Sequence, residues 1–306
     1  MMCHNNLRFM SGTICLILTL ALVSGCIAED LSKCFKGISL KAHLQNDISG
    51  GEEAVKDISL YVFDDKDLLV DILPFSISET VVLNYKDIPT LHCIALGNIR
   101  GGEVAVSDLK PGDPLEKGFI SLQQVNNRAA ILTRAANIYN SPSDLFFGEI
   151  KLENNTVANR SEESREFMIS RMVASMNITI RGLQRITGRA DDNYSVVVHE
   201  TASMEDFKGR FGGAPAAYQP EGSMNDRREF IVPSFNLLPT VNNSGLTIDI
   251  YHDNQLLRTV TTANDNRPII PVIGKTLNVL VNFEGSADIN LVIGKWGDTH
   301  IWKDFG

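Results

Sequence analysis

The chain has 306 residues, of which 43% are hydrophobic, and it carries 28 basic and 37 acidic side chains, a net charge of −9 at pH 7. This acidic balance argues against a nucleic-acid partner, because phosphates need a basic face. It also gives no electrostatic attraction to anionic lipid. The length suits two domains of ordinary size, each with its own core.

The first 26 residues have the order of a secretory signal. Arg8 precedes an apolar run over residues 14–23, and the small residues Ser24 and Gly25 stand before Cys26. The apolar run is shorter than the ~20 residues that a membrane-spanning helix requires. We therefore predict a signal peptide over residues 1–25, cut between Gly25 and Cys26. The alternatives are an uncleaved membrane helix and an ordinary signal peptide. Removal of the signal takes away Arg8 and leaves a net charge of −10.

The cysteine placed directly after Ser24-Gly25 resembles the lipobox of bacterial lipoproteins. This resemblance implies that Cys26 is acylated, with palmitate or a similar chain, and that residues 26–35 form a lipidated tether. Each buried methylene contributes about 0.8 kcal/mol, so a cysteine with two or three chains stays at the membrane. Glu29 and Asp30 resemble the signal that sends lipoproteins to the outer surface of the outer membrane in Bacteroides-type bacteria. The inner leaflet is the alternative location.

Apolar and polar residues alternate in short runs along most of the mature chain, which is typical of half-buried strands. Asp64–Asp67 and His252–Gln255 lie between such runs and predict hairpin turns. The only predicted helix is a short one over residues 126–139. Many short strands and few helices predict an all-β protein made of β-sandwiches. The predicted strands cover residues 38–44, 58–63, 81–83, 91–96, 172–180, 194–199, 246–251, 256–261, 277–283 and 289–293.

A polar stretch over residues 153–164 divides the mature chain near its middle. We place the domain boundary there, with an N-terminal domain over residues 36–158 and a C-terminal domain over residues 159–306, although part of the stretch can itself be strand. The glycine-rich residues 209–222 predict a long surface loop within the second domain.

Cys34 and Cys93 are the cysteines that remain beside Cys26 in the mature chain. A disulfide between them would close a long loop in an oxidising compartment. Cys93 lies in an apolar run, however, where it can equally be a small core residue, and the sequence leaves both readings open. The two cysteines lack the CxxC spacing of a zinc site, and the histidines are scattered on what we expect to be solvated faces or turns. No metal site or cofactor is expected.

The catalytic motifs that we searched for are missing or incomplete. Gly274-Lys275-Thr276 has the end of a phosphate-binding loop, but Ile269 stands where that motif needs glycine. The segment also opens a predicted strand, whereas the phosphate cradle requires a helix. The sequence contains no HExxH or GxSxG motif. We therefore expect a protein that is not an enzyme.

Several short motifs, in order along the chain, resemble the FimB/Mfa-type fimbrial-anchor lipoproteins of Bacteroidales. Cys34 follows Cys26 closely, and a strand and turn with the sequence DISLYVFD comes next. A later strand ends in Gly97-Asn98, and a Trp lies near the end of the chain, here Trp302. The second half opens with an R-x-V-A motif, here Arg171-Met172-Val173-Ala174.

This resemblance implies two tandem transthyretin-like Greek-key sandwiches and a role at the base of a fimbrium. It implies that fimbrial stalk subunits are the partners and that an acylated cysteine holds the protein in the outer membrane. In the family, stalk subunits lose their first strand to a protease, and a neighbour's strand fills the groove by β-strand addition. Anchors keep both their lipid and their first strand.

The predicted function is therefore that of an outer-membrane lipoprotein that anchors a fimbrium, with a role in its length. One alternative is a stalk, tip or adhesin subunit of the same family. A surface glycan-binding lipoprotein is another, but Trp296 and Trp302 are the only tryptophans available for an aromatic platform.

Overall fold

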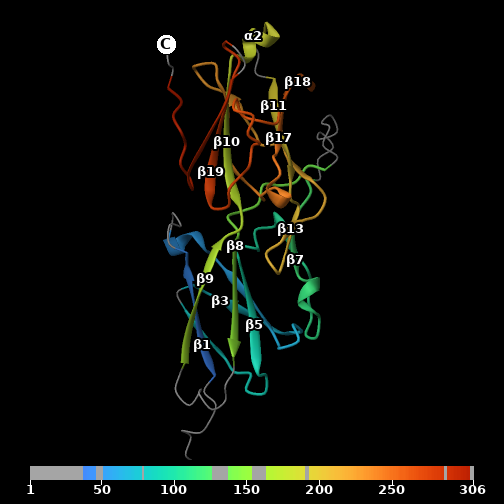
Figure 1. The fold of residues 1–306 in the computed structure, drawn as a ribbon, viewed down its shortest axis with the longest axis vertical. Helices are drawn as coiled ribbons and strands as arrows, with labels where there is room; N and C mark the ends of the chain where they lie inside the picture. Colours follow the sequence, from blue (N-terminus) through green and yellow to red (C-terminus); the bar gives the residue numbers. More distant parts are fainter. Residues whose placement is uncertain are drawn as a thin grey trace, which may run out of the picture.

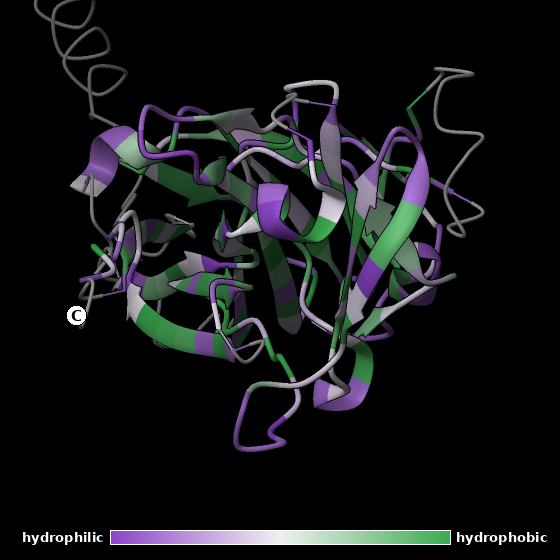
Figure 2. Ribbon diagram, turned by 90° about the horizontal axis from the view of Figure 1, so that it is seen from above, coloured by the Kyte–Doolittle hydropathy of each residue, from purple (hydrophilic) through white to green (hydrophobic). Residues whose placement is uncertain are grey.

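The computed structural model describes residues 37–45, 51–77, 79–125, 137–153, 163–189, 193–285 and 288–303. The chain is nearly all β, and its sheets are stacked into an elongated molecule (Figure 1). The sheet that contains β1 forms the lower part in that view, and the sheets that contain β10 and β17 form the upper part. Seen from above, hydrophilic residues are prominent in the peripheral loops (Figure 2).

The first part is built on a seven-stranded sheet with the order β3-β2-β5-β8-β9-β1-β4. Only two residue pairs join β8 to β9, and the portions on either side of this contact share one core. Phe75 and Phe167 stack across that core with their ring centroids 6.2 Å apart. The strands are β1 (Ile38–Leu44), β2 (Ile58–Phe63), β3 (Leu69–Phe75), β4 (Thr80–Leu83), β5 (Thr90–Gly97), β8 (Phe146–Glu153) and β9 (Glu163–Arg171).

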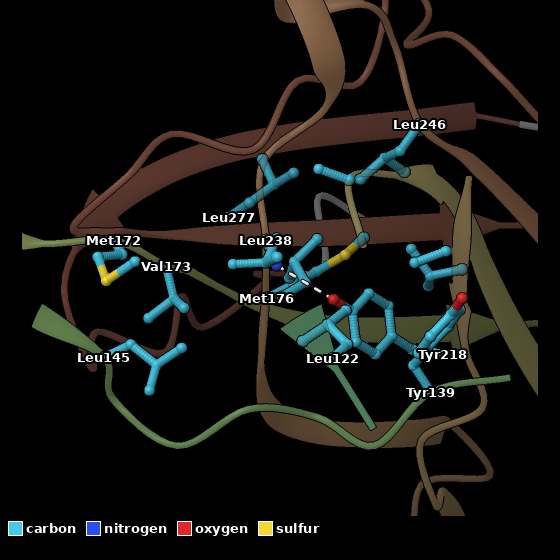
Figure 3. Close-up of a cluster of buried hydrophobic side chains, with 14 of the residues drawn as sticks. Leu122, Tyr139, Leu145, Met172, Val173, Met176, Tyr218, Leu238, Leu246 and Leu277 are labelled. Atoms are coloured by element: carbon cyan, nitrogen blue, oxygen red, sulfur yellow. Dashed lines mark hydrogen bonds between the residues drawn. The ribbon is translucent and has the colours of Figure 1, made fainter. Parts of the chain in front are cut away.

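The second part consists of two sheets with a shared core. The five-stranded sheet has the order β15-β16-β10-β19-β20, and the four-stranded sheet has the order β14-β11-β17-β18. Figure 3 shows part of this core, where Met176 and Leu277 lie near Leu246. The strands are β10 (Ala174–Arg181), β11 (Tyr194–Thr201), β14 (Ala216–Tyr218), β15 (Ser223–Met224), β16 (Phe230–Leu237), β17 (Thr247–His252), β18 (Gln255–Val260), β19 (Lys275–Asn282) and β20 (Asp288–Lys295).

A fourth sheet, made of short strands, ties the two parts together. Its order is β13-β12-β7-β6, with β6 (Val104–Val106) and β7 (Phe119–Leu122) from the first half of the chain and β12 (Met204–Asp206) and β13 (Phe211–Gly212) from the second. Phe207 follows β12 and packs edge-on against Tyr61 of β2, with ring centroids 4.8 Å apart. The core of the second part therefore continues into the first.

The predicted hairpins are confirmed. Between β2 and β3, the Asp64 carboxylate accepts hydrogen bonds from the backbone N–H groups of Lys66 and Leu68, both 2.9 Å long. Between β17 and β18, Asp253 and Asn254 have φ values of 47° and 63°. Asp and Asn tolerate this left-handed conformation, which two-residue hairpin loops with the twist of the flanking strands require.

The predicted helix over residues 126–139 is not seen where the structure describes it. Residues 126–136 lie outside the described ranges, and Ile138 and Tyr139 at its end are extended, forming bridges to Ala217 and Gln124. The described helices are α2 (Leu183–Thr187) and the 3₁₀ turns η2 (Gly51–Ala54), η3 (Leu115–Lys117) and η5 (Val241–Asn243).

Two burial expectations were wrong. Strands β2 and β5 were expected to be half-buried, but almost every residue in them is buried, because the fourth sheet covers the face that was expected to be solvated. The glycine-rich residues 209–222 were expected to be a surface loop, but β13 and β14 lie within them. Tyr218 is 1% exposed, and its hydroxyl accepts a hydrogen bond from the Leu238 N–H (Figure 3).

The chain crosses between the two parts after β9. Strand β9 pairs with β1 and β8, so it belongs with the seven-stranded sheet although it lies beyond the predicted boundary between residues 158 and 159. Met172 and Val173 then lead directly into β10. The alternation from Met172 to Ile180 correctly predicted this strand, and Ala174, Met176 and Ile178 are fully buried.

Candidate assembly sites at the two ends of the molecule

Strand β1 lies between β9, with which it runs parallel, and β4, with which it runs antiparallel. All seven of its residues have a partner on β9, and the Gln45 N–H extends the ladder to the Ile169 carbonyl at 3.0 Å. The first strand of the described chain thus fills a groove between two others.

The inner face of β1 is closed off from water. Ile38, Leu40 and Ala42 are each at most 1% exposed and belong to the core of the first part. Full burial of an Ile or Leu side chain stabilises a fold by roughly 1.5–3 kcal/mol. Without β1 the groove would expose a continuous apolar surface together with the unpaired edges of β4 and β9.

Gly37 sets the point at which the chain enters this groove. Its φ is +83°, and a Cβ atom there would lie 2.7 Å from Val82 Cγ1 and 2.9 Å from the Leu83 carbonyl oxygen. Any other residue would therefore be strained and would collide with β4. The glycine thus fixes the point beside β4 at which β1 begins.

The direction of β1 places its first residue far from the second part. Strand β9 ends at Arg171 and continues upward into β10 (Figure 1). Because β1 runs parallel to β9, its beginning at Ile38 lies beside Glu163, at the end of β9 that points away from the second part. The start of β1 and the second part therefore lie at opposite ends of the first part.

The predicted lipid and cleavage site at Gly25 and Cys26 lies outside the described residues, as does Cys34. Cys93 is buried on β5 in the core of the first part and is a free thiol in the structure. Burial raises the pKa of this thiol to about 12, so it is an unreactive core side chain. Because Cys34 is not described, the disulfide between Cys34 and Cys93 stays a prediction.

Arg171 of the R-x-V-A motif fastens the junction between the two parts. It is 5% exposed, and its Nε atom lies 2.9 Å from both carboxylate oxygens of Asp144. Its guanidinium also lies over the Trp296 ring, 4.3 Å from the centroid. Burial raises the pKa of Asp144, although Arg171 opposes this shift. The side chain joins the loop before β8 to the residue that follows β20.

Asn98, in the Gly-Asn motif at the end of β5, has a structural role. It adopts a φ of 60°, and its side-chain oxygen accepts a hydrogen bond from the Lys56 N–H at 2.7 Å. Its amide nitrogen donates to the carbonyl oxygens of Ala54 and Asp144 at 2.8 and 2.7 Å. This one side chain therefore satisfies three backbone groups in two segments near the junction, the stretch before β2 and the loop before β8.

The last described residues cross the outer face of the five-stranded sheet (Figure 1, red). This face is polar yet buried, with Asn177 on β10 donating to Asn278 on β19 at 2.9 Å. The His300 N–H donates to the same Asn278 oxygen at 2.8 Å, and Arg181 donates to the Trp302 carbonyl at 3.1 Å. Polar side chains of the sheet thus hold the C-terminal segment by its backbone.

The histidines were placed only partly correctly. His92 was expected on a solvated face or turn, but it is 5% exposed, with its two ring nitrogens 2.7 Å from Asp67 and 2.8 Å from Glu149. It ties the β2–β3 turn to β8. Across the ranges that the structure covers, no three His, Cys, Asp or Glu residues gather in a way that could hold a metal ion. Gly274-Lys275-Thr276 leads into β19, a strand, as predicted.

No helix among the described residues has the length and apolar character needed to cross a membrane. Sequence reasoning missed the partners of Arg171 and the polar cradle under the C-terminal segment. The motif around Arg171 pointed to the first of these features, and the position of Trp302 near the end of the chain pointed to the second. The contacts themselves join residues far apart in the sequence.

Comparison with known proteins decides the family. A family model described as fimbrillin-A associated anchor proteins Mfa1 and Mfa2 matches residues 31–302. The chain belongs to this family. The major fimbrium anchoring subunit FimB of Porphyromonas gingivalis is 26% identical over 298 residues, which cover 92% of each chain.

The fold comparison agrees with this family. The structure of the fimbrial anchor protein Mfa2 from Porphyromonas gingivalis aligns with a TM-score of 0.58 at 12% identity, covering 85% of this chain and 97% of that one. The expected FimB/Mfa-type resemblance and the all-β fold class are therefore confirmed.

Proposed function

We propose that this member of the family is an outer-membrane lipoprotein that anchors a fimbrium through acylated Cys26 and takes part in setting its length. The observation that carries the proposal is the seating of β1. The strand nearest the predicted tether occupies the groove of the first part, with its apolar face fully buried. Such a strand connects a lipid at the membrane to the folded body without a break in the chain.

The seated strand also supports a role in fimbrial length. A subunit whose groove is filled by its own first strand cannot accept a strand from a neighbour. Such a subunit is therefore the last one, at the membrane, in a row of subunits that are joined by donated strands. We propose that the first stalk subunit joins the second part instead, by β-strand addition.

Strand addition supplies enough free energy for such a joint. A partner strand of about ten residues would bury about five side chains, each contributing roughly 1.5–3 kcal/mol. Its ladder hydrogen bonds would contribute about 0.5–1.5 kcal/mol each. Together these contributions exceed the free-energy cost of ordering the strand, so such a joint can hold a filament.

Replacement of the lipidated cysteine tests the anchoring role. We expect Cys26→Ala to release both the protein and intact fimbriae into the medium, as measured by immunoblotting of cells and supernatant. Cys34→Ala is the matched control, because it removes the neighbouring thiol of the tether and should leave the fimbriae on the cells. Cell-bound fimbriae in the Cys26→Ala strain would contradict the proposal.

N-terminal analysis of the assembled protein separates an anchor from a stalk subunit. A first residue at acylated Cys26 supports the anchor. A first residue after an internal arginine, with β1 removed, would support a stalk subunit instead.

A further inference from the structure

The outer edge of β20 is open over a short, defined length. Within the described ranges β20 pairs with β19 on one side only, and it forms the edge of the five-stranded sheet. Native proteins normally protect such edges, because their free N–H and C=O groups can pair with another strand.

Both ends of this edge are blocked by the chain itself. At one end the Asn264 side chain accepts from the Ile289 N–H at 2.6 Å, and the Asn264 N–H donates to the Ile289 carbonyl at 3.1 Å. At the other end Asp298 accepts from the Lys295 N–H and donates its own N–H to the Lys295 carbonyl, both at 3.0 Å.

The middle of the edge is left unblocked. Outward backbone groups of a strand recur at every second residue, and those of Ile289 and Lys295 point outward. The N–H and C=O groups of Leu291 and Ile293 therefore also face outward. In the part of the chain that the structure describes, these outward groups have no hydrogen-bond partner. The free edge offers four hydrogen bonds.

An apolar groove of about 490 Å³ runs beside this free edge. The Ile293 side chain is 55% exposed and Val272 is 39% exposed, and both line the same groove, so they form an exposed apolar patch. The side chains that line the groove are Arg267, Pro268, Ile270, Val272, Leu277, Leu291 and Ile293. A strand added to β20 would point every second side chain into this groove.

Two lysines face each other next to the groove, near the Asp298 carboxylate that accepts the Lys295 N–H. Lys275 and Lys295 are direct partners in the β19–β20 ladder and lie on the same strand face as Leu277 and Ile293. Like charges directly opposite each other destabilise a sheet. Neither ammonium has an ion-pair partner among the described residues, although the whole chain is acidic. A carboxylate placed there would relieve their repulsion.

We propose that this edge and groove bind a short extended segment of a fimbrial subunit by strand addition to Leu291–Ile293. The segment carries apolar side chains at alternate positions, which enter the groove, and a carboxylate at the end that lies beside Lys275 and Lys295. This inference rests on the proposed anchoring function and names the surface on the second part that meets the fimbrium.

The experiment uses the full-length protein in its own cells. Ile293→Arg places a cation in the groove and changes a side chain that is already exposed, so the fold should persist. Lys275→Glu with Lys295→Glu reverses the charge at the end of the groove. Asn290→Arg is the matched control, because Asn290 is an exposed residue of the same strand whose side chain lies on the opposite face.

We expect Ile293→Arg and the double charge reversal each to lower the cell-bound fimbriae at least tenfold, with the variant protein still in the outer membrane. Asn290→Arg should match the wild type. A photo-crosslinking amino acid at position 293 should form a covalent product whose peptide comes from an extended apolar and acidic segment of a fimbrial subunit.

Normal fimbriation in both variants would overturn this surface assignment, as would a crosslink at position 293 to a second copy of this chain. These results would leave the anchoring proposal intact if Cys26→Ala still released fimbriae together with the protein. Release of fimbriae by Ile293→Arg with the protein retained in the membrane separates the two proposals.

Discussion

Glu205 is a carboxylic acid buried in the sheet that joins the two parts of the molecule. It is 4% exposed, and within the described structure its Oε2 atom has no hydrogen-bond partner. Burial, reinforced by the charge of Asp206, raises the pKa of Glu205 to about 8. The folded protein therefore holds a proton on this group at neutral pH, whereas the unfolded chain does not.

This difference makes folding stability depend on pH. Between the ordinary pKa near 4.5 and about 8 the folded state binds more protons than the unfolded state, so the free energy of unfolding falls as pH rises. The loss amounts to at most about 1.4 kcal/mol for each pH unit.

We expect Glu205→Gln to remove this pH dependence, because glutamine is neutral in both states. Urea unfolding should show nearly equal stability of the two proteins at pH 4.5 and a growing advantage of the variant toward pH 8. Glu221→Gln, at an exposed position, should follow the wild-type curve. Parallel curves for Glu205→Gln and the wild type would contradict a buried protonated carboxyl group.

Strand β1 is the element on which both the fold of the first part and the anchoring proposal depend. We expect Leu40→Ala to lower the free energy of unfolding by about 2–5 kcal/mol, because it leaves a cavity at a fully buried position. Ser39→Ala, on the outer face of the same strand, should change it by less than about 0.5 kcal/mol. Equal effects in chemical unfolding would show that β1 is not seated as described.

The positions of the strands were easier to predict from the sequence than the pairing of one strand with another. Alternation of apolar residues revealed β1 and β10, because one face of each must be buried. It could not reveal that β1 pairs with β9, since that ladder joins distant segments. Tyr218 was missed because the glycines around it suggest a loop, whereas it lies in the core and its hydroxyl accepts a hydrogen bond from the distant Leu238 N–H. The motif at Arg171 could be recognised in the sequence, but the contacts of Arg171 with Asp144 and Trp296 could not be predicted from it.

Phe207 couples the two parts of the molecule. It comes from the second half of the chain and packs against Tyr61 and Phe63 of the first. Gly118 makes room for it, because a Cβ atom there would collide with the phenyl ring. A large aromatic side chain in this position makes the two parts share one core.

We expect Phe207→Ala to lower stability by about 3–5 kcal/mol and to separate unfolding into two transitions in calorimetry. Phe119→Ala is the control, because Phe119 is in the same joining sheet but 37% exposed, and it should keep a single transition near the wild-type temperature. One unshifted transition for Phe207→Ala would mean that the parts are joined mainly through Arg171.

The parallel alignment of β1 and β9 has a mechanical consequence if the protein is anchored as proposed. Tension from a fimbrium on the second part would pull β9 upward, and the proposed tether would pull β1 downward along the same axis. The two neighbours are thus loaded in shear, and the hydrogen bonds between them must yield together instead of opening one after another. A strand seated in this way resists extraction most strongly along the line on which the filament would pull.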